Sequence, residues 1–335
     1  MRMRLAPVLV LPLALLGCSD DDPAADPGGG NPPEALEAPT PEEGLQISMR
    51  ATAMPGEEIW KCQVSELPNR SVASVHRVVS RQTAGIHHMD IMVLTLAGVS
   101  LEPGVYDCDG LYREHTALME SGVILFASQN ADQTVQLPEG VAANLPARLL
   151  VMQEIHYVNT TSEPRDVASY VNAYTMPTSE VREQIWGFAI RDTHLNIPAA
   201  TEHHEWTRCV MSEDVDLLFL ASHTHELGAN VTVRSFDGQQ PGEVIYSNDD
   251  WHAPVLKQFE TPLHVPAGSG FEFDCHFINP RREEVRWGFA AQEEMCQIAI
   301  VFTPGSFSAR CDVVDSSDGV LDDGDGMDET TPPMP

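Results

Sequence analysis

Four short segments of the chain contain histidine, glutamate, methionine or cysteine, side chains that can bind a metal ion. In one of them, His223-Thr224-His225, the two histidines are separated by a single residue. Side chains alternate between the faces of a strand, so these imidazoles would lie on one face, about 7 Å apart. That spacing allows both rings to bind one metal ion. The four segments, in chain order, are His87-His88-Met89, Glu154-Ile155-His156-Tyr157, His223-Thr224-His225 and Glu294-Met295-Cys296.

The adjacent pair His87-His88 needs a less regular backbone. Neighbouring residues of a regular strand face opposite ways, so both rings can reach one metal only at a strand end or a β-bulge. Gly85, just before the pair, permits such a distortion. A rival pair, His203-His204, lies among polar residues that predict a loop, and we do not expect it to form a site.

The residue types favour copper. Imidazole suits zinc, copper, iron and nickel, whereas a thioether adds a preference for soft Cu(I). Two histidines with Met295 therefore point to copper, and three histidines without a carboxylate also suit copper, with zinc as the alternative. Taken alone, some of these residues also have an ordinary structural interpretation. His156 could be a partly buried histidine held by a hydrogen bond, and Met295 could be a core residue.

The elements that position these segments are predicted to be strands. Short runs rich in β-branched and aromatic residues are bounded by Gly, Pro, Asn and Asp, and helical periodicity is weak. Many short strands at this spacing favour antiparallel sandwiches. We therefore predict an all-β fold of two antiparallel β-sandwich domains, over residues 45–175 and 176–311.

Both ends of the chain are acidic. The chain has 50 Asp and Glu against 19 Lys and Arg, a net charge of −31, which excludes a nucleic-acid binder that relies on a basic face. Residues 19–44 are also rich in Pro and Gly and are predicted to be a disordered linker. Residues 312–335 are predicted to be a disordered acidic tail. The EF-hand pattern fails there, because counting back from Gly326 puts Leu321 at loop position 1.

Residues 1–18 have the features of an export signal. Arg2 and Arg4 precede an apolar run over residues 5–16, which is too short to span a membrane. Leu15-Leu16-Gly17-Cys18 resembles the processing box of bacterial lipoproteins. We expect a lipidated Cys18 that anchors the protein to a bacterial membrane, at the periplasmic face or the cell surface, with no other membrane contact. An ordinary signal peptide cut nearby is the alternative.

Six cysteines remain after Cys18, and an even number in an exported protein predicts three disulfides. The number alone leaves their pairing open. These cysteines are Cys62, Cys108, Cys209, Cys275, Cys296 and Cys311.

Taken together, the four segments resemble the copper type II, ascorbate-dependent monooxygenases, the family of dopamine β-monooxygenase and peptidylglycine α-hydroxylating monooxygenase. The order HHM, (Q/E)-x-HY, HTH and EMC is the family's order. The gaps from His88 to His156, from His156 to His223 and from His225 to Met295 are 68, 67 and 70 residues, similar to the family's spacing. The resemblance extends over residues 45–311.

The resemblance implies two jelly-roll-like sandwiches that face each other across a cleft, with one copper on each. His87, His88 and His156 would hold an electron-storing copper. His223, His225 and Met295 would hold the catalytic copper, where O2 and a small organic substrate meet. The implied activity is hydroxylation of an activated C–H bond, with ascorbate or an equivalent one-electron reductant. The implied disulfides are Cys62–Cys108, Cys209–Cys311 and Cys275–Cys296.

The chain also departs from the family. The peptide-oxidising branch has Arg two residues before its HTH motif and Tyr four residues after the methionine ligand, whereas this chain has Ala221 and Ala299. Glycine-extended peptides are therefore not the expected substrates. Two other function classes stay open: a copper-binding surface lipoprotein that acts as a store or sensor without catalysis, and an adhesion or scaffold protein whose histidines are structural.

Overall fold

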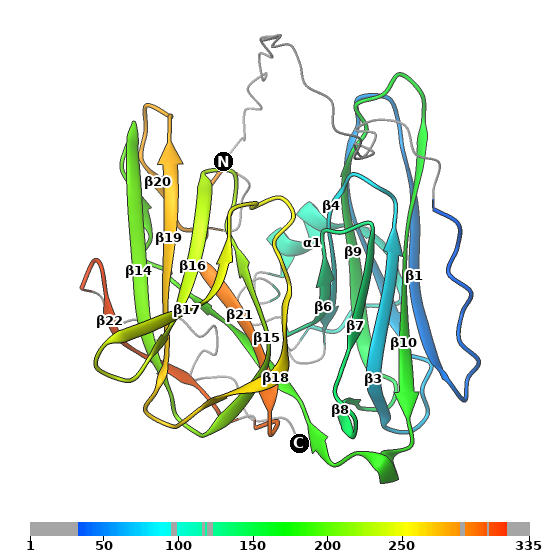
Figure 1. Cartoon of the computed structure of the whole chain (residues 1–335). Helices are drawn as coiled ribbons and strands as arrows, with labels where there is room; N and C mark the ends of the chain where they lie inside the picture. Colours follow the sequence, from blue (N-terminus) through cyan, green and yellow to red (C-terminus); the bar gives the residue numbers. More distant parts are fainter. Residues whose placement is uncertain are drawn as a thin grey trace, which may run out of the picture.

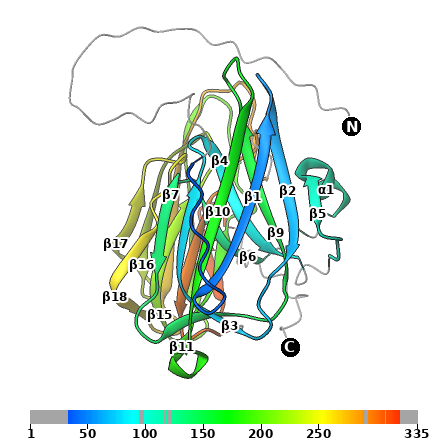
Figure 2. The same ribbon diagram turned by 90° about the vertical axis from the view of Figure 1, so that its right-hand side faces the viewer.

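The computed structural model describes residues 33–94, 99–115, 118, 123–288, 292–306 and 308–319, without the side chains of His87 and Val123. Regular structure in these residues is almost entirely strand, in several mainly antiparallel sheets (Figure 1, Figure 2). The prediction of an all-β fold is confirmed, and the sandwich form of each predicted domain stays a prediction. The signal segment, with Cys18, lies outside the described residues.

The first part of the chain forms two sheets. Its elements are β1 (Gly44–Ala53), β2 (Glu58–Glu66), β3 (Ala73–Gln82), β4 (Ile86–Val93), β5 (Gly104–Asp107), α1 (Cys108–Glu114), β6 (Val123–Ser128), β7 (Asp132–Gln136), β8 (Val141–Leu145), β9 (Leu150–Val158), β10 (Arg165–Met176), a 3-10 turn (Thr178–Glu180) and β11 (Glu183–Gln184). Sheet A has the order β1-β10-β3-β8-β11, with β7 paired to β3, and sheet B the order β5-β2-β9-β4-β6. Met49 and Val171 of sheet A share one buried apolar cluster with Met89 and Ile155 of sheet B.

The second part also forms two main sheets, together with a separate pair of short strands. Its strands are β12 (Trp186–Arg191), β13 (Asn196–Ile197), β14 (Thr201–Met211), β15 (Val215–His223), β16 (Gly228–Phe236), β17 (Pro241–Asn248), β18 (Lys257–Val265), β19 (Gly270–Asn279), β20 (Val285–Arg286), β21 (Gln297–Thr303) and β22 (Cys311–Ser316). Sheet C has the order β17-β16-β19-β14-β22 and sheet D the order β12-β21-β15-β18, while β13 and β20 pair separately.

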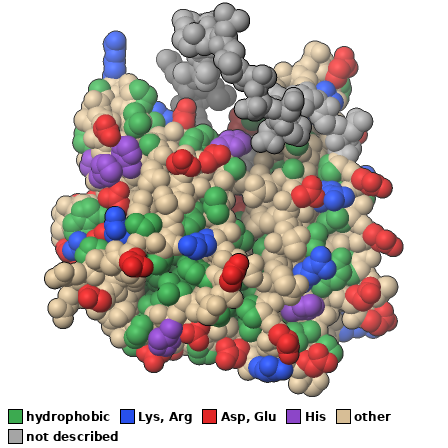
Figure 3. Space-filling view, in the orientation of Figure 1, with side chains coloured by type: hydrophobic (Ala, Val, Ile, Leu, Met, Phe, Trp, Pro, Cys, Tyr) green, Lys and Arg blue, Asp and Glu red, His purple; other side chains and the backbone are tan. Residues whose placement is uncertain are grey.

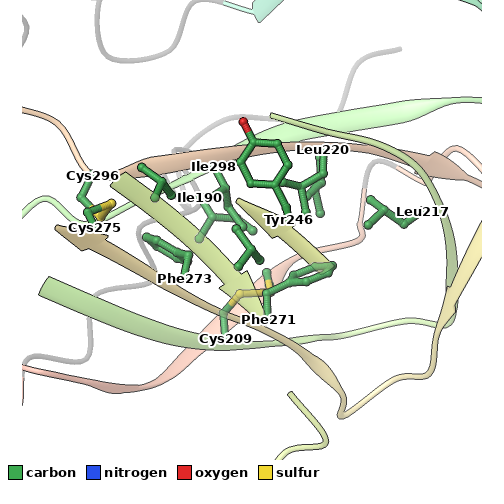
Figure 4. Close-up of a cluster of buried hydrophobic side chains, with 14 of the residues drawn as sticks. Ile190, Cys209, Leu217, Leu220, Tyr246, Phe271, Phe273, Cys275, Cys296 and Ile298 are labelled. Carbon is green, nitrogen blue, oxygen red and sulfur yellow. A yellow bond between two sulfur atoms is a disulfide. The ribbon is translucent and has the colours of Figure 1, made fainter. Parts of the chain in front are cut away.

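Strand β19 shows how the sequence builds the second core. Phe271, Phe273, Cys275 and Phe277 alternate along it and are fully buried, as expected when one face of a strand packs inward. All four belong to one buried cluster with residues of sheet D such as Ile298. Figure 4 shows Phe271, Phe273 and Cys275 in this cluster. This core determines which side chains of β15 and β21 point inward. These two strands border the HTH and EMC motifs.

Sheet D packs against the second core on one face and, near the middle of β15, against the first part of the chain on the other. Leu217 and Leu220 of β15 face the second core, whereas Leu218 and Phe219 pack against Leu137 and Val141 of the first part of the chain. A register shift between Leu217 and Phe219 accompanies this change of side. The continuous apolar run of β15 therefore belongs to a strand whose middle is buried on both faces.

Two predictions about disorder need correction. The last part of the predicted linker is ordered against sheet A, because Gln46 and Asn172 donate side-chain hydrogen bonds to the carbonyls of Leu36 (3.0 Å) and Glu37 (2.8 Å). The predicted tail also begins too early. Residues up to Ser316 form β22, which pairs with β14 at the edge of sheet C. Residues 1–32 and 320–335 lie outside the described part of the chain.

The cysteines pair as the family resemblance implies. The structure contains the disulfides Cys62–Cys108, Cys209–Cys311 and Cys275–Cys296. Three disulfides indicate folding in an oxidising compartment, as expected of an exported protein. Within the described ranges, none of the helices combines the length and apolar character that crossing a bilayer requires.

Asp192, beside β12, is a buried aspartate with a perturbed pKa. Its carboxylate accepts hydrogen bonds from the His194 backbone N–H (3.0 Å) and the Thr207 hydroxyl (3.3 Å). Burial, together with the nearby charges of Glu205 and Asp318, outweighs these donors and raises the pKa of Asp192 to about 6. The folded state therefore prefers the protonated carboxyl.

This preference predicts a pH dependence of stability. A carboxyl pKa raised by folding stabilises the native state below the unfolded pKa, and the contribution is lost as the pH rises from about 4 to 6. At about 1.4 kcal/mol for each pKa unit, the loss is on the order of 2–3 kcal/mol. We expect Asp192→Asn to flatten this decrease when the free energy of unfolding in urea is measured at pH 4 and 7. The exposed control Asp249→Asn should follow the wild type, and parallel curves for wild type and Asp192→Asn would contradict the assignment.

Candidate metal centres

The HTH motif lies at the end of β15 and in the turn that leads to β16. His223 is the last residue of β15 and is paired with Gln297, the first residue of β21. The His223 and His225 rings have centroids 5.2 Å apart and an interplanar angle of 82°. The turn is tight, since a Cβ on Gly228 would lie 2.1 Å from the Thr224 hydroxyl oxygen. The two imidazoles therefore lie together, as their spacing predicts.

Glu294 connects this turn to Met295. Its fully buried carboxylate accepts backbone hydrogen bonds from His225 (2.7 Å) and Met295 (3.0 Å) on Oε2, and from Leu227 (2.7 Å) on Oε1. Burial raises the pKa of Glu294, while these donors and His225 favour its charged form. One carboxylate oxygen thus holds the backbones of His225 and Met295 side by side.

The orientation of His225 is fixed by a second contact. Its Nδ1 lies 2.9 Å from the carbonyl oxygen of Glu293, which can only accept, so Nδ1 carries the proton. The lone pair available to a metal is then on Nε2. This is the usual arrangement of a metal-binding histidine, whose other nitrogen donates to a carbonyl or carboxylate.

Met295 is held on its other side as well. It is buried, and the next residue, Cys296, is bonded to Cys275 of β19. Two imidazoles and a thioether would form a donor set that suits Cu(I). Residues of the HTH and EMC motifs are thus close together, and the assignment of His223, His225 and Met295 as ligands of one ion stays a prediction.

The first pair of motifs meets in sheet B. Strand β4 follows Gly85, which has a φ of +85°, and His88 is paired directly with His156 of β9. The register shifts between Ile86 and His88, so His87 is the additional residue of a bulge. The distortion predicted at this pair is confirmed, although the His87 side chain lies outside the described atoms. The His88 and His156 rings are 5.3 Å apart between centroids, at 67°.

Two carboxylates flank His88. Its Nδ1 lies 3.1 Å from Glu154 Oε1 and 3.5 Å from Asp90 Oδ2. Burial alone would lower the pKa of His88, but hydrogen bonds to Asp90 and Glu154 and their charges raise it to about 10. Burial alone would raise the pKa of Glu154, but His88 and the hydroxyl of Tyr112, which donates to Oε2, lower it. The protein thus holds His88 firmly through a buried carboxylate.

His156 has its own acidic partner. Its Nε2 lies 2.7 Å from Glu58 Oε1, so Nε2 carries the proton and Nδ1 the lone pair. Burial lowers the pKa of His156, in opposition to Glu58. Trp60, paired with His156 across β2 and β9, lies with its ring centroid 5.9 Å from the imidazole. The ligand set His87, His88 and His156 stays a prediction, of which the structure shows that the rings of His88 and His156 are neighbours.

Sequence reasoning did not find the carboxylates that position these histidines. Glu154 and Glu294 belong to the motifs, but the sequence predicted no positioning role for them. Asp90 and Glu58 lie outside the motifs. An acidic residue within an otherwise apolar strand was the available signal, since such a group must find partners when buried. The prediction of a loop at His203-His204 was also wrong, because both residues belong to β14.

The second part of the chain matches a known family. Residues 186–318 match the family model described as copper type II ascorbate-dependent monooxygenase, C-terminal domain. The matched residues include His223, His225, Met295 and the two disulfides Cys209–Cys311 and Cys275–Cys296.

Similarity to solved structures is weak. One match is the atomic structure of Sulfolobus Turreted Icosahedral Virus, at 7% identity, with 78% of this chain and 90% of that chain covered and a TM-score of 0.34. Another is the PBSX exported protein XepA, at 10% identity, with 84% and 96% covered and a TM-score of 0.20. Scores this low support no inference about fold or function.

Proposed function

We propose that the protein is an exported copper-dependent monooxygenase that hydroxylates an activated C–H bond of a small organic substrate, with O2 and a one-electron reductant such as ascorbate. The observation that carries the proposal is the Glu294 carboxylate, which holds His225 and Met295 together within the part of the chain that matches the family model. His223, His225 and Met295 would hold one copper. His87, His88 and His156 would hold a second.

Bound copper would supply one-electron transfer and activation of O2. The chain's own residues supply rigidity and orientation. The carbonyl of Glu293 fixes the tautomer of His225, and the Cys275–Cys296 disulfide ties the backbone next to Met295 to the core of sheet C. In sheet B, Glu154 and Glu58 orient His88 and His156. Such fixed partners keep metal ligands in place without reorganisation during turnover.

The surface beside His223 supports a substrate without a carboxylate. Ala221 lies two residues before His223 and is paired with Ala299 across β15 and β21. Ala221 is partly and Ala299 largely exposed on the face of sheet D that carries His223. These are the two positions where the peptide-oxidising branch has Arg and Tyr, and methyl groups cannot bind a carboxylate. We therefore propose a neutral or cationic substrate.

The proposed location follows from the disulfides and the N-terminal sequence. Three disulfides support export. The processing box before Cys18 supports a lipid anchor to a bacterial membrane. The net charge of −31 supports the absence of a nucleic-acid partner. A copper-binding lipoprotein without catalysis is the second candidate, because it would use the same ligands.

Oxygen consumption distinguishes the two candidates. Full-length protein is loaded with copper, supplied with ascorbate and offered a panel of neutral and cationic C–H substrates. We expect two coppers for each chain and O2 consumption that rises with a substrate. His223→Ala should lose one copper and the coupled consumption, whereas His264→Ala, an exposed histidine paired with Asp216, should retain both. Copper binding without coupled consumption across the panel would favour the store or sensor.

A further inference from the structure

A third group of histidines lies on the outer face of sheet C. Strands β14 and β19 are antiparallel neighbours, and their register puts His204 directly opposite His276. The two imidazole rings are stacked, with centroids 4.3 Å apart and an interplanar angle of 4°. Glu202 lies two residues before His204, and Asp274 two residues before His276, so all four side chains share this face. Figure 3 shows histidine side chains gathered on the surface of this part of the molecule, at its upper left.

The nitrogens of this pair are directed to different partners. His204 Nδ1 lies 2.9 Å from Asp274 Oδ1, so this nitrogen carries the proton and Nε2 the lone pair. His276 Nε2 is buried and has no hydrogen bond of good geometry among the described residues, although the Glu202 carboxylate is 2.9 Å away. Burying a polar nitrogen without a hydrogen bond or a bound ligand costs free energy of folding.

The three groups can converge on one ion. One ligand atom each from Glu202, His204 and His276 lies within 4.8 Å of the others. The two carboxylates, Glu202 and Asp274, make the cluster anionic when the imidazoles are neutral, so a divalent cation would be attracted to it. Asp274 would act as the outer partner that orients a ligating histidine.

We propose that Glu202, His204 and His276 form a surface binding site for Zn²⁺, separate from the two copper centres and independent of the proposed oxygenase activity. Two histidines and one carboxylate are an established zinc donor set, with the remaining position open to water. The ion would join two neighbouring strands of sheet C. The nitrogen and carboxylate donors, without sulfur, distinguish this site from the one that includes Met295.

Zinc titration of the metal-free full chain tests the site. Equilibrium dialysis counts the Zn²⁺ bound, so zinc that enters the copper centres contributes equally to all proteins compared. We expect His204→Gln to bind one equivalent less than the wild type. Asp274→Asn removes the charged partner of His204 Nδ1. It should decrease the affinity for this one Zn²⁺ by about 10- to 100-fold. Both positions are at least partly exposed, and near-ultraviolet circular dichroism verifies the fold.

The matched control is His264→Gln. His264 is also an exposed histidine with its Nδ1 2.9 Å from an aspartate, Asp216, and it should retain the wild-type zinc number. The proposal is overturned if His204→Gln binds as much Zn²⁺ as the wild type with unchanged affinity, or if His204→Gln and His264→Gln lose zinc equally. Neither result depends on oxygenase activity, which the His223 variant tests separately.

Discussion

Replacement of Met295 by leucine will decrease ascorbate-dependent, substrate-coupled O2 consumption by more than about 100-fold. Loss of a direct ligand should exceed the 10- to 100-fold losses that are typical when an outer partner of a metal site is removed. Leucine fills a similar volume, so the exchange should cost less than about 1.5 kcal/mol of stability. A loss of O2 consumption in this variant would therefore be due to the missing thioether and not to altered packing of the buried side chain.

The control for this substitution is Met89→Leu. Met89 is also fully buried in a strand and directly follows a histidine pair, but its side chain belongs to the first apolar core. We expect this variant to retain wild-type turnover and copper content. If Met295→Leu consumed O2 at the wild-type rate, or if both variants lost activity equally, Met295 would have no special role.

Glu294→Gln should have the second large effect. The amide provides one oxygen where the carboxylate provides two, so at least one of the backbone N–H groups of His225, Leu227 and Met295 loses its acceptor. A buried donor without a partner costs about 1–3 kcal/mol. We expect a loss of this size in the free energy of unfolding, together with weaker copper binding only at the centre of His223, His225 and Met295, measured by denaturant titration and copper competition.

Glu293→Gln is the matched control for this change. The side chain of Glu293 is exposed, and its backbone carbonyl, which binds His225, is unchanged by the substitution. Stability and copper affinity should remain those of the wild type. Equal copper affinities for Glu294→Gln and the wild type would show that the carboxylate does not position the ligands.

Local spacing predicted two local features of the motifs, whereas the ligand sets themselves stay predictions. The one-residue separation of His223 and His225 predicted neighbouring rings, although His225 lies in the turn after β15 and not in the strand. Gly85 predicted the bulge at His87, because a bulge depends on the local backbone. The roles of Glu154 and Glu294 could not be predicted in this way. Each carboxylate acts across strands or turns far apart in sequence, and only the folded register brings them together.

The errors at His203-His204 and in the acidic tail have different physical causes. In β14 several inward positions are polar, including the buried Glu205 and Thr207, so the alternation that identifies a strand is hidden. In β22 the acidic composition indicated a solvated segment. There Asp315 pairs with Arg208 of β14 at 2.8 Å, which stabilises an edge strand despite its charge.

The central claim is that the sulfur of Met295 and the imidazoles of His223 and His225 bind one copper. X-ray absorption spectroscopy at the copper edge of the Cu(I)-loaded protein measures this directly. The account predicts a sulfur neighbour of copper in the wild type that disappears in Met295→Leu and persists in Met89→Leu. A wild-type spectrum with only nitrogen and oxygen neighbours would contradict it.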